Sequence, residues 1–291
     1  MDYRHFIITR FNLKFPGNVW EKDRLGNSVL TDEWLASRVD LFMKYCLPSV
    51  QKQSNRNFQW LIYFNTGTKE AVLQHFRDLE LKNTNLRILL ADGYDDFMKR
   101  YCSDVLSYCD DSTEYIITTR LDNDDIVHRD FTARIQEVFS GQDFMAVNFV
   151  KILMLDPENK DKIFIDYSFS NHFISVIEKV VSYKISGCYS RGDKDWNRNN
   201  QISHIIDKPY CIEIISERNL GNCFRGFPVF RKTDLSAFSL SPQVFRNSLS
   251  DHDNFKFWKM SWKKLLISKK MSIIYHLHNK EQIHGYLARE N

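Results

Sequence analysis

The sequence predicts an α/β domain whose central sheet is mostly parallel and carries helices on both faces. Two observations lead to this prediction. Apolar runs rich in β-branched residues alternate with helical patterns through the first 130 residues, an order that favours parallel strands joined by crossover helices. The chain also has 291 residues, 43% hydrophobic and 26% charged, which is enough to bury a full core without disulfides.

Hydrophobic periodicity places the elements of the first half. Short apolar runs predict strands at residues 5–9, 59–64, 86–90 and 115–119. Helical spacing predicts helices at residues 31–50, 69–79 and 97–108. Thr31 precedes two acids and is expected to cap the first helix, which Pro48 should kink or divide.

After residue 140 the pattern changes from helices to strands. Residues 144–155 and 163–167 flank a polar turn and predict a hairpin, and residues 210–216 predict a further strand. The polar run 186–200 is expected to be a surface loop. Residues 255–270 project as a helix with Trp258, Trp262 and Leu266 on one side and lysines on its flank. Such helices are typical of membrane surfaces, although a helix that packs its aromatic face on the domain is the favoured alternative.

Composition excludes several classes of protein. A net charge of +3 argues against a protein that coats nucleic acid, and no apolar run reaches the roughly 20 residues that span a bilayer. The first apolar stretch is too short and interrupted for a signal peptide, so we expect a cytosolic protein. The six cysteines include no CxxC pair, and we expect reduced thiols in the core rather than a zinc site.

The acidic segment after the strand at 115–119 is the strongest signal for chemistry. It reads Arg120-Leu-Asp-Asn-Asp-Asp125, and ligands of open α/β sheets collect at the carboxyl ends of the strands. Three carboxylates in four positions repel one another unless a cation or a basic group compensates. Oxygen ligands suit Mg²⁺ or Mn²⁺, which typically bridge to substrate phosphates. The alternative is an acidic turn in which Asp125 or Asp130 caps the next helix.

These motifs, in this order, resemble family 2 glycosyltransferases. Residues 47–53 and 58–65 are similar to the helix-then-strand opening of these enzymes, and residues 115–125 to their metal-binding segment. The run His5-Phe-Ile-Ile-Thr-Arg-Phe-Asn12 is most similar to the rhamnosyltransferase group, and the resemblance covers about the first 250 residues. It implies a GT-A, Rossmann-like fold, a nucleotide-diphosphate sugar donor, Mn²⁺ or Mg²⁺, and work on bacterial surface polysaccharide.

The resemblance also assigns residues to the donor. Asp122 and Asp124 match the metal ligands, and Asn123 lies between them. Thr9, Phe11 and Asn65 fall where the first strands of the family meet the nucleotide base and ribose, although Asn65 stands where these enzymes commonly have an aspartate. Residues 1–254 would form the GT-A domain, with 1–140 as the nucleotide-sugar and metal half and 141–254 as the acceptor half. Residues 255–291 would form a basic, aromatic helical extension.

A segment further along the chain carries the candidate catalytic base. Residues 226–232, followed by 250–258, resemble the acceptor-side segment of the same superfamily, in which an acidic pair opens a helix. An inverting transfer needs a carboxylate that accepts the proton of the acceptor hydroxyl. The resemblance makes Asp251 this base and Asp253 the fallback. Asp251 could instead serve only as a helix cap.

We therefore expect an inverting, metal-dependent glycosyltransferase, with rhamnose as the sugar that the resemblance favours. Its partners would be a nucleotide-diphosphate sugar and a glycan or lipid-linked glycan, with peripheral contact to the inner membrane surface. Two other classes stay open. A sugar nucleotidyltransferase would normally carry a Gly-rich loop after the first strand, and residues 9–14 contain no glycine. A glycan-binding protein on the same fold would bind without turnover.

Overall fold

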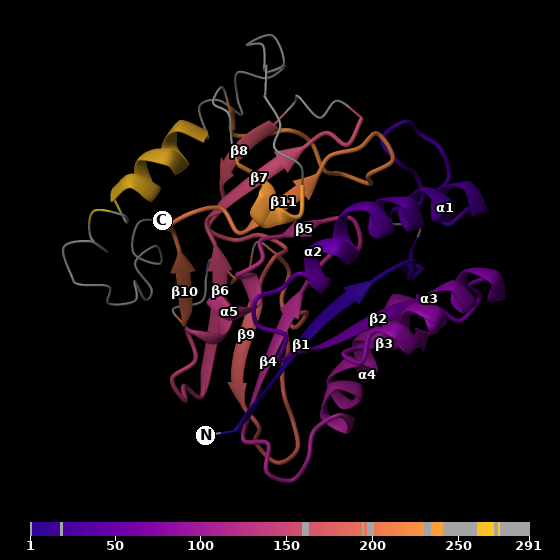
Figure 1. Ribbon diagram of the computed structural model, residues 1–291, viewed down its shortest axis with the longest axis horizontal. Coiled ribbons are helices and arrows are strands. Elements are labelled where there is room, and N and C mark those ends of the chain that lie inside the picture. Colours follow the sequence, from indigo (N-terminus) through magenta and orange to yellow (C-terminus); the bar gives the residue numbers. More distant parts are fainter. Residues whose placement is uncertain are drawn as a thin grey trace.

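The computed structural model describes residues 2–17, 20–158, 163–193, 195–196, 201–229, 234–240, 261–270 and 273. Two sheets organise this part of the chain. Figure 1 shows the larger sheet running through the middle of the molecule, with helices against it and the smaller sheet at the top of the view.

The larger sheet has seven strands in the order β10-β6-β9-β4-β1-β2-β3. Pairs β1–β2, β1–β4, β2–β3 and β6–β10 are parallel, and only β9 runs antiparallel, to β4 and β6. The prediction of a mostly parallel sheet is therefore confirmed, and strands from both halves of the chain share it. The bounds are β1 (Tyr3–Arg10), β2 (Gln59–Asn65), β3 (Leu86–Ala91), β4 (Tyr115–Arg120), β6 (Phe144–Phe149), β9 (Ser175–Lys179) and β10 (Ile202–Ile205).

Helices cover both faces of this sheet, as predicted. One apolar cluster packs Phe42, Phe76 and Phe131 on the sheet, and the cluster on the other face contains Phe97 and Tyr101 of α4. Aromatic and aliphatic side chains thus fill both interfaces, and burial of such groups is the main favourable term in folding. The helices are α1 (Asp32–Leu41), α2 (Leu47–Gln51), α3 (Glu70–Lys82), α4 (Gly93–Ser107) and α5 (Phe131–Gln136).

The first predicted helix begins and divides where the sequence indicates. The hydroxyl of Thr31 accepts a hydrogen bond from the backbone N–H of Trp34, at 3.2 Å, which makes Thr31 the N-cap of α1. Pro48 has no N–H to donate to the preceding turn. The chain forms a π-helical turn, η1 (Phe42–Cys46), directly before α2, where Pro48 is the second residue.

The smaller sheet has the strand order β12-β8-β7-β11-β5. Its strands are β5 (Ile126–Val127), β7 (Lys151–Leu155), β8 (Ile163–Tyr167), β11 (Cys211–Ile214) and β12 (Phe227–Pro228), and the short 3-10 helix η3 (Ser236–Phe238) follows. The predicted hairpin is confirmed by the antiparallel pairing of β7 with β8. Its first arm, however, breaks at Val150, so that β6 joins the large sheet and β7 the small one.

None of the six cysteines is paired in a disulfide, and the prediction that they lie in the core holds for three of them. Cys46, Cys188 and Cys211 are buried. No helix in the described part of the chain combines the length and hydrophobicity that crossing a bilayer requires.

A buried histidine makes the stability of this fold dependent on pH. His5 lies in β1, where its Nδ1 accepts from the side-chain amide of Gln136 at 3.0 Å, so its Nε2 donates to the hydroxyl of Thr119 at 2.9 Å. Burial lowers the pKa of His5 to about 3. Between pH 6.5 and 3 the unfolded chain therefore binds more protons than the folded chain, and stability falls as the pH falls.

We expect His5 alone to remove about 2 kcal/mol of unfolding free energy between pH 7 and pH 5. Urea unfolding at the two pH values measures the loss, and His5→Gln should have a shallower pH dependence. The exposed His75 of α3 is the control, since His75→Gln should keep the wild-type slope. Equal slopes for wild type and His5→Gln would contradict the assignment.

Candidate functional site

A cleft of about 1160 Å³ opens at the carboxyl ends of β1 and β4. Three walls come from the segment that follows β1, from α1 and from residues 218–222, and the floor is the acidic segment after β4. Open α/β sheets bind their ligands at such strand ends. Among the described residues, the charged and aromatic groups that line the cleft are Arg10, Phe11, Lys14, Phe15, Trp20, Glu21, Lys22, Trp34, Arg38, Arg120, Asp122, Asp124, Asp193 and Arg218.

Each carboxylate on the cleft floor has its own basic partner. Arg120 donates to both oxygens of Asp122, at 3.1 and 3.0 Å. A guanidinium nitrogen of Arg38 lies 2.5 Å from Oδ1 of Asp124. Like charges this close together need a cation or a basic group to offset them, and basic side chains do so here.

The third carboxylate of the segment, that of Asp125, pairs with a histidine and not with an arginine. Nε2 of His172 lies 2.7 Å from Oδ2 of Asp125, and the backbone N–H of Ile214 donates to Oδ1 at 3.1 Å. Asp125 is thus buried between the turn that precedes β9 and strand β11, and it does not cap α5. Asp130 does occupy the N-cap position of α5, but its side chain makes no capping hydrogen bond. The interpretation of the segment as a helix-capping turn is therefore wrong.

The pKa values follow from these pairs. Burial alone would raise the pKa of Asp122, but the charges of Arg120, His172 and Arg10 hold it below its usual range. Burial and the neighbouring charge of Asp124 raise the pKa of Asp125. Burial would lower the pKa of His172, yet Asp125 and Asp122 raise it above its ordinary value. The raised pKa of His172 favours its protonated form, which adds positive charge beneath the cleft.

The donor atoms on the floor fit a divalent cation. Among the described residues, Asp122, Asp125 and His172 each bring one ligand atom to within 4.8 Å of the others. Two carboxylate oxygens and an imidazole nitrogen form a set that Mn²⁺ accepts, once His172 has released the proton that it shares with Asp125. Asp122 was predicted as a metal ligand from the sequence, whereas Asp125 and His172 were not. Asp124, the other predicted ligand, faces Arg38.

The residues predicted to meet the nucleotide have different surroundings. Asn123 lines the cleft and ties it together, since its amide donates to the carbonyl of Phe11 at 2.8 Å and its Oδ1 accepts from Arg38. Phe11 also lines the cleft and stacks on Phe64, with ring centroids 4.6 Å apart. Thr9 and Asn65 are not among the described residues of the cleft wall. Thr9 accepts from the indole of Trp60 at 2.9 Å, and Asn65 accepts from the N–H of Gly67 in its own turn.

Asp251 and Asp253, the candidates for the catalytic base, lie outside the described residues. Their role remains a prediction from the sequence.

Arg10 is a member of the site that the sequence analysis missed. Its guanidinium carbon lies 4.7 Å from the ring centre of Tyr189, 5.4 Å from that of Tyr94 and 5.5 Å from that of Phe15. Its buried Nε has no hydrogen-bond partner within the described part of the chain. Arg10 and Arg120 are the last residues of the parallel neighbours β1 and β4. The sequence signal that could have identified both arginines is a basic residue at the last position of a predicted strand.

The fold and the acidic segment after β4 together define the class, an α/β fold of the GT-A type. The family follows from comparison with known proteins. Residues 5–212 match the family described as "Putative rhamnosyl transferase". Since the match covers more than half of the 291 residues, the chain belongs to that family. No curated protein matches the chain.

Several solved structures are similar to the chain. Residues 1–349 of TarS from S. aureus match at 11% identity over 72% of this chain and 60% of that one, with a TM-score of 0.41. The same part of TarS in complex with UDP-GlcNAc matches at 11% identity over 75% and 60%, with a TM-score of 0.42. A "putative nucleotide-diphospho-sugar transferase" from Desulfovibrio desulfuricans G20 matches at 12% identity over 73% and 80%, with a TM-score of 0.35. The chain thus spans 60% of the length of the TarS fragment.

Proposed function

We propose that this chain transfers a sugar from a nucleotide-diphosphate donor to a hydroxyl of a bacterial surface glycan, with inversion and with the aid of Mn²⁺ or Mg²⁺. Membership of the rhamnosyl transferase family favours rhamnose as the sugar. The observation that carries the proposal is the cleft at the ends of β1 and β4, where Asp122, Asn123 and Asp124 meet three arginines.

The balance of charge on the cleft floor favours a diphosphate as the ligand. Four carboxylates, those of Asp122, Asp124, Asp125 and Asp193, are matched by four basic groups, those of Arg10, Arg38, Arg120 and His172. The floor is therefore not acidic before the donor arrives. Guanidinium groups bind phosphate oxygens through charge-assisted hydrogen bonds. The Nε–H of Arg10, which has no hydrogen-bond partner among the residues that the structure describes, is a donor that such a ligand could use.

A divalent cation would be held by Asp122 and by the Asp124 oxygen that Arg38 does not contact, with Asp125 and His172 as the alternative to Asp124. When bound, it supplies Lewis-acid stabilisation of the departing diphosphate. The chain's own residues supply the rest of the chemistry. Asp251 would take the proton from the acceptor hydroxyl as its oxygen bonds to the anomeric carbon. The bond from that carbon to the diphosphate oxygen breaks in the same step.

A thermal-shift screen of nucleotide-sugars, with and without Mn²⁺, tests the proposal. A donor at 100 times its Kd should add about 2.7 kcal/mol of stability, which raises the Tm of a chain of this length by roughly 4–5 °C. Release of nucleoside diphosphate from the same donor would then separate a transferase from a glycan-binding protein. Pyrophosphate release from a nucleoside triphosphate and a sugar phosphate would instead indicate a nucleotidyltransferase and overturn the proposal.

Replacing Arg10 with glutamine should lower donor affinity about 10- to 100-fold, because one charge-assisted hydrogen bond to a diphosphate is lost. Titration calorimetry with the donor identified in the screen measures the change. Arg77, an exposed residue of α3 paired with Glu70, provides the control, and Arg77→Gln should bind as wild type does. Unaltered affinity in Arg10→Gln would place the diphosphate away from β1.

A further inference from the structure

The helix at residues 261–270 presents its faces in the opposite way to an ordinary surface helix. Its two serines, Ser261 and Ser268, are each only 3% exposed, whereas Trp262 is 49% exposed and Leu266 is 62% exposed. A surface helix normally turns its apolar side chains to the core and its polar ones to water. Ile273, seven residues after Leu266, is 60% exposed as well. Such a row of exposed apolar side chains indicates a surface that binds a partner.

The inward face of the helix is already docked on the rest of the domain. Ile267 packs on the cluster that contains Val150 and Phe169. The ammonium of Lys264 lies 3.4 Å from a carboxylate oxygen of Asp166, which is buried in β8. The orientation of the helix is therefore fixed by contacts on one face. Leu266 points away from the domain, and the half-exposed Trp262 lies beside it with one edge against Phe227 of β12, at 5.2 Å between ring centroids.

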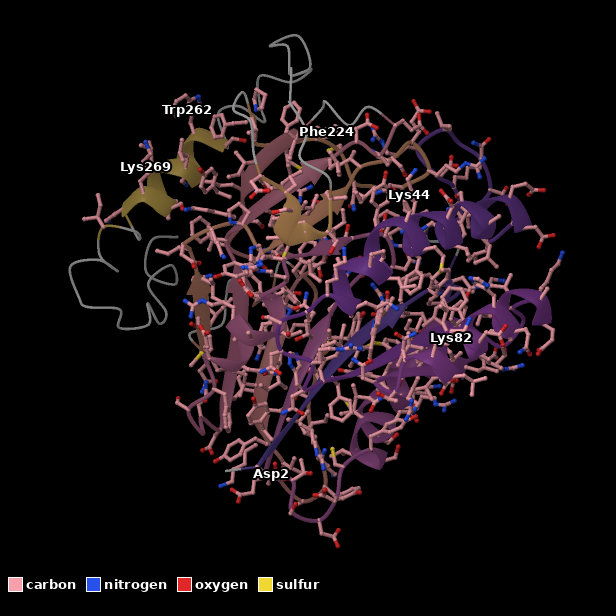
Figure 2. The ribbon with its side chains drawn as sticks, in the orientation of Figure 1. Asp2, Lys44, Lys82, Phe224, Trp262 and Lys269 are labelled. Carbon is pink, nitrogen blue, oxygen red and sulfur yellow. The ribbon has the colours of Figure 1, made fainter. Side chains whose placement is uncertain are left out.

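Lysines border the outward row on both sides. With 3.6 residues per turn, Trp262 and Leu266 lie along one line, Lys269 lies on one edge of it and Lys263 on the other. Both lysines are exposed. Figure 2 shows Trp262 and Lys269 extending outward from this helix, on the opposite side of the molecule from Lys82.

We propose that this face, formed by Trp262, Leu266, Lys263 and Lys269, docks on an anionic lipid surface. Tryptophan favours the boundary between headgroups and acyl chains. Lysine can bury its alkyl stem beside the apolar row while its ammonium stays among the phosphates. A second copy of the chain fits this face less well, because a symmetric contact would bring the lysines of both copies together. The proposal extends the proposed function and does not depend on it, since it concerns where the chain binds and not what it transfers.

Co-sedimentation with vesicles tests the proposal without any donor. The full chain should bind vesicles of phosphatidylcholine with 30% phosphatidylglycerol at low salt, and bind pure phosphatidylcholine weakly. Each lysine near such a surface contributes about five-fold in affinity. The double variant Lys263→Glu/Lys269→Glu should therefore lose about 25-fold or more, and Leu266→Ser should weaken binding to both kinds of vesicle.

Lys82→Glu/Lys99→Glu is the matched control, because it changes the net charge equally on exposed residues of α3 and α4. It should retain most of the binding. Equal losses in the two double variants would reduce the effect to net charge and overturn the assigned face. No binding by the wild type also overturns the proposal. So does lipid-free self-association, seen by sedimentation velocity and abolished by Leu266→Ser, which would assign the face to a second copy.

Discussion

Asp124→Ala is expected to abolish metal-dependent donor binding and also to destabilise the fold by about 3 kcal/mol. The second effect arises because Arg38 is buried beside Asp124, and removal of one partner leaves a buried charge unpaired. From the sequence alone the same change would relieve repulsion among the acids and leave the fold intact. The ion pair with Arg38 reverses that expectation.

A double variant separates the two effects. Asp124→Ala/Arg38→Met removes both charges, so it should recover most of the lost stability in urea unfolding without recovering donor binding in calorimetry. The control is the exposed ion pair between Asp32 of α1 and Lys69, which lies just before α3. Asp32→Ala should lower the free energy of unfolding by less than about 1 kcal/mol. Should the single and double variants be equally stable, the pair with Arg38 would not be energetically important. Donor binding that survives in Asp124→Ala would remove Asp124 from the site.

The sequence predicts the elements of this fold well where the signal is local. The strand that became β4 and the cap at Thr31 depend on neighbouring residues, and both were found within a residue or two. The position of the acidic segment follows from the same local pattern. The first arm of the hairpin could not be predicted in full. Its break at Val150 depends on which sheet each half of the arm joins, and the periodicity of residues 144–155 does not show this.

The partners of the acidic residues could not be predicted in the same way. Arg38 precedes Asn123 by 85 residues, and His172 follows Asp125 by 47. No spacing rule connects residues that meet only when a helix or a strand packs against the sheet. The polar run 186–200 illustrates the same point. It was predicted to be a surface loop, yet Tyr189 within it is buried, donates to the carbonyl of Ile8 at 3.1 Å and lies over Arg10.

The charges found on the cleft floor change what a cation has to do there. The like charges of the acidic segment are already offset by arginines, so a metal ion is not needed to hold the segment together. The natural role for Mn²⁺ or Mg²⁺ is then with the phosphates of the donor. Chelation should therefore reduce donor binding and leave the Tm of the free protein unchanged. Thermal melts with and without EDTA, each run with and without donor, measure both effects.

The largest effect on turnover is expected from Asp251→Asn. Inverting transfer needs a carboxylate that receives the proton of the acceptor hydroxyl as that oxygen attacks the anomeric carbon. Asparagine keeps the size of the side chain and can still cap a helix, but it cannot accept a proton at neutral pH. Loss of a general base typically lowers the rate 10²- to 10⁴-fold, so kcat should fall on that order.

Donor affinity separates a missing base from a damaged site. Asp251→Asn should bind the donor as wild type does, because the proposed metal and diphosphate contacts come from Asp122 and the arginines of the cleft. Asp234, an exposed residue whose carboxylate accepts from the N–H of Ser236, is the control, and Asp234→Asn should retain normal turnover. Near-normal turnover in Asp251→Asn, together with an inactive but folded Asp253→Asn, would move the base to Asp253. If neither change slows transfer, the proton must go to a group outside this acidic pair.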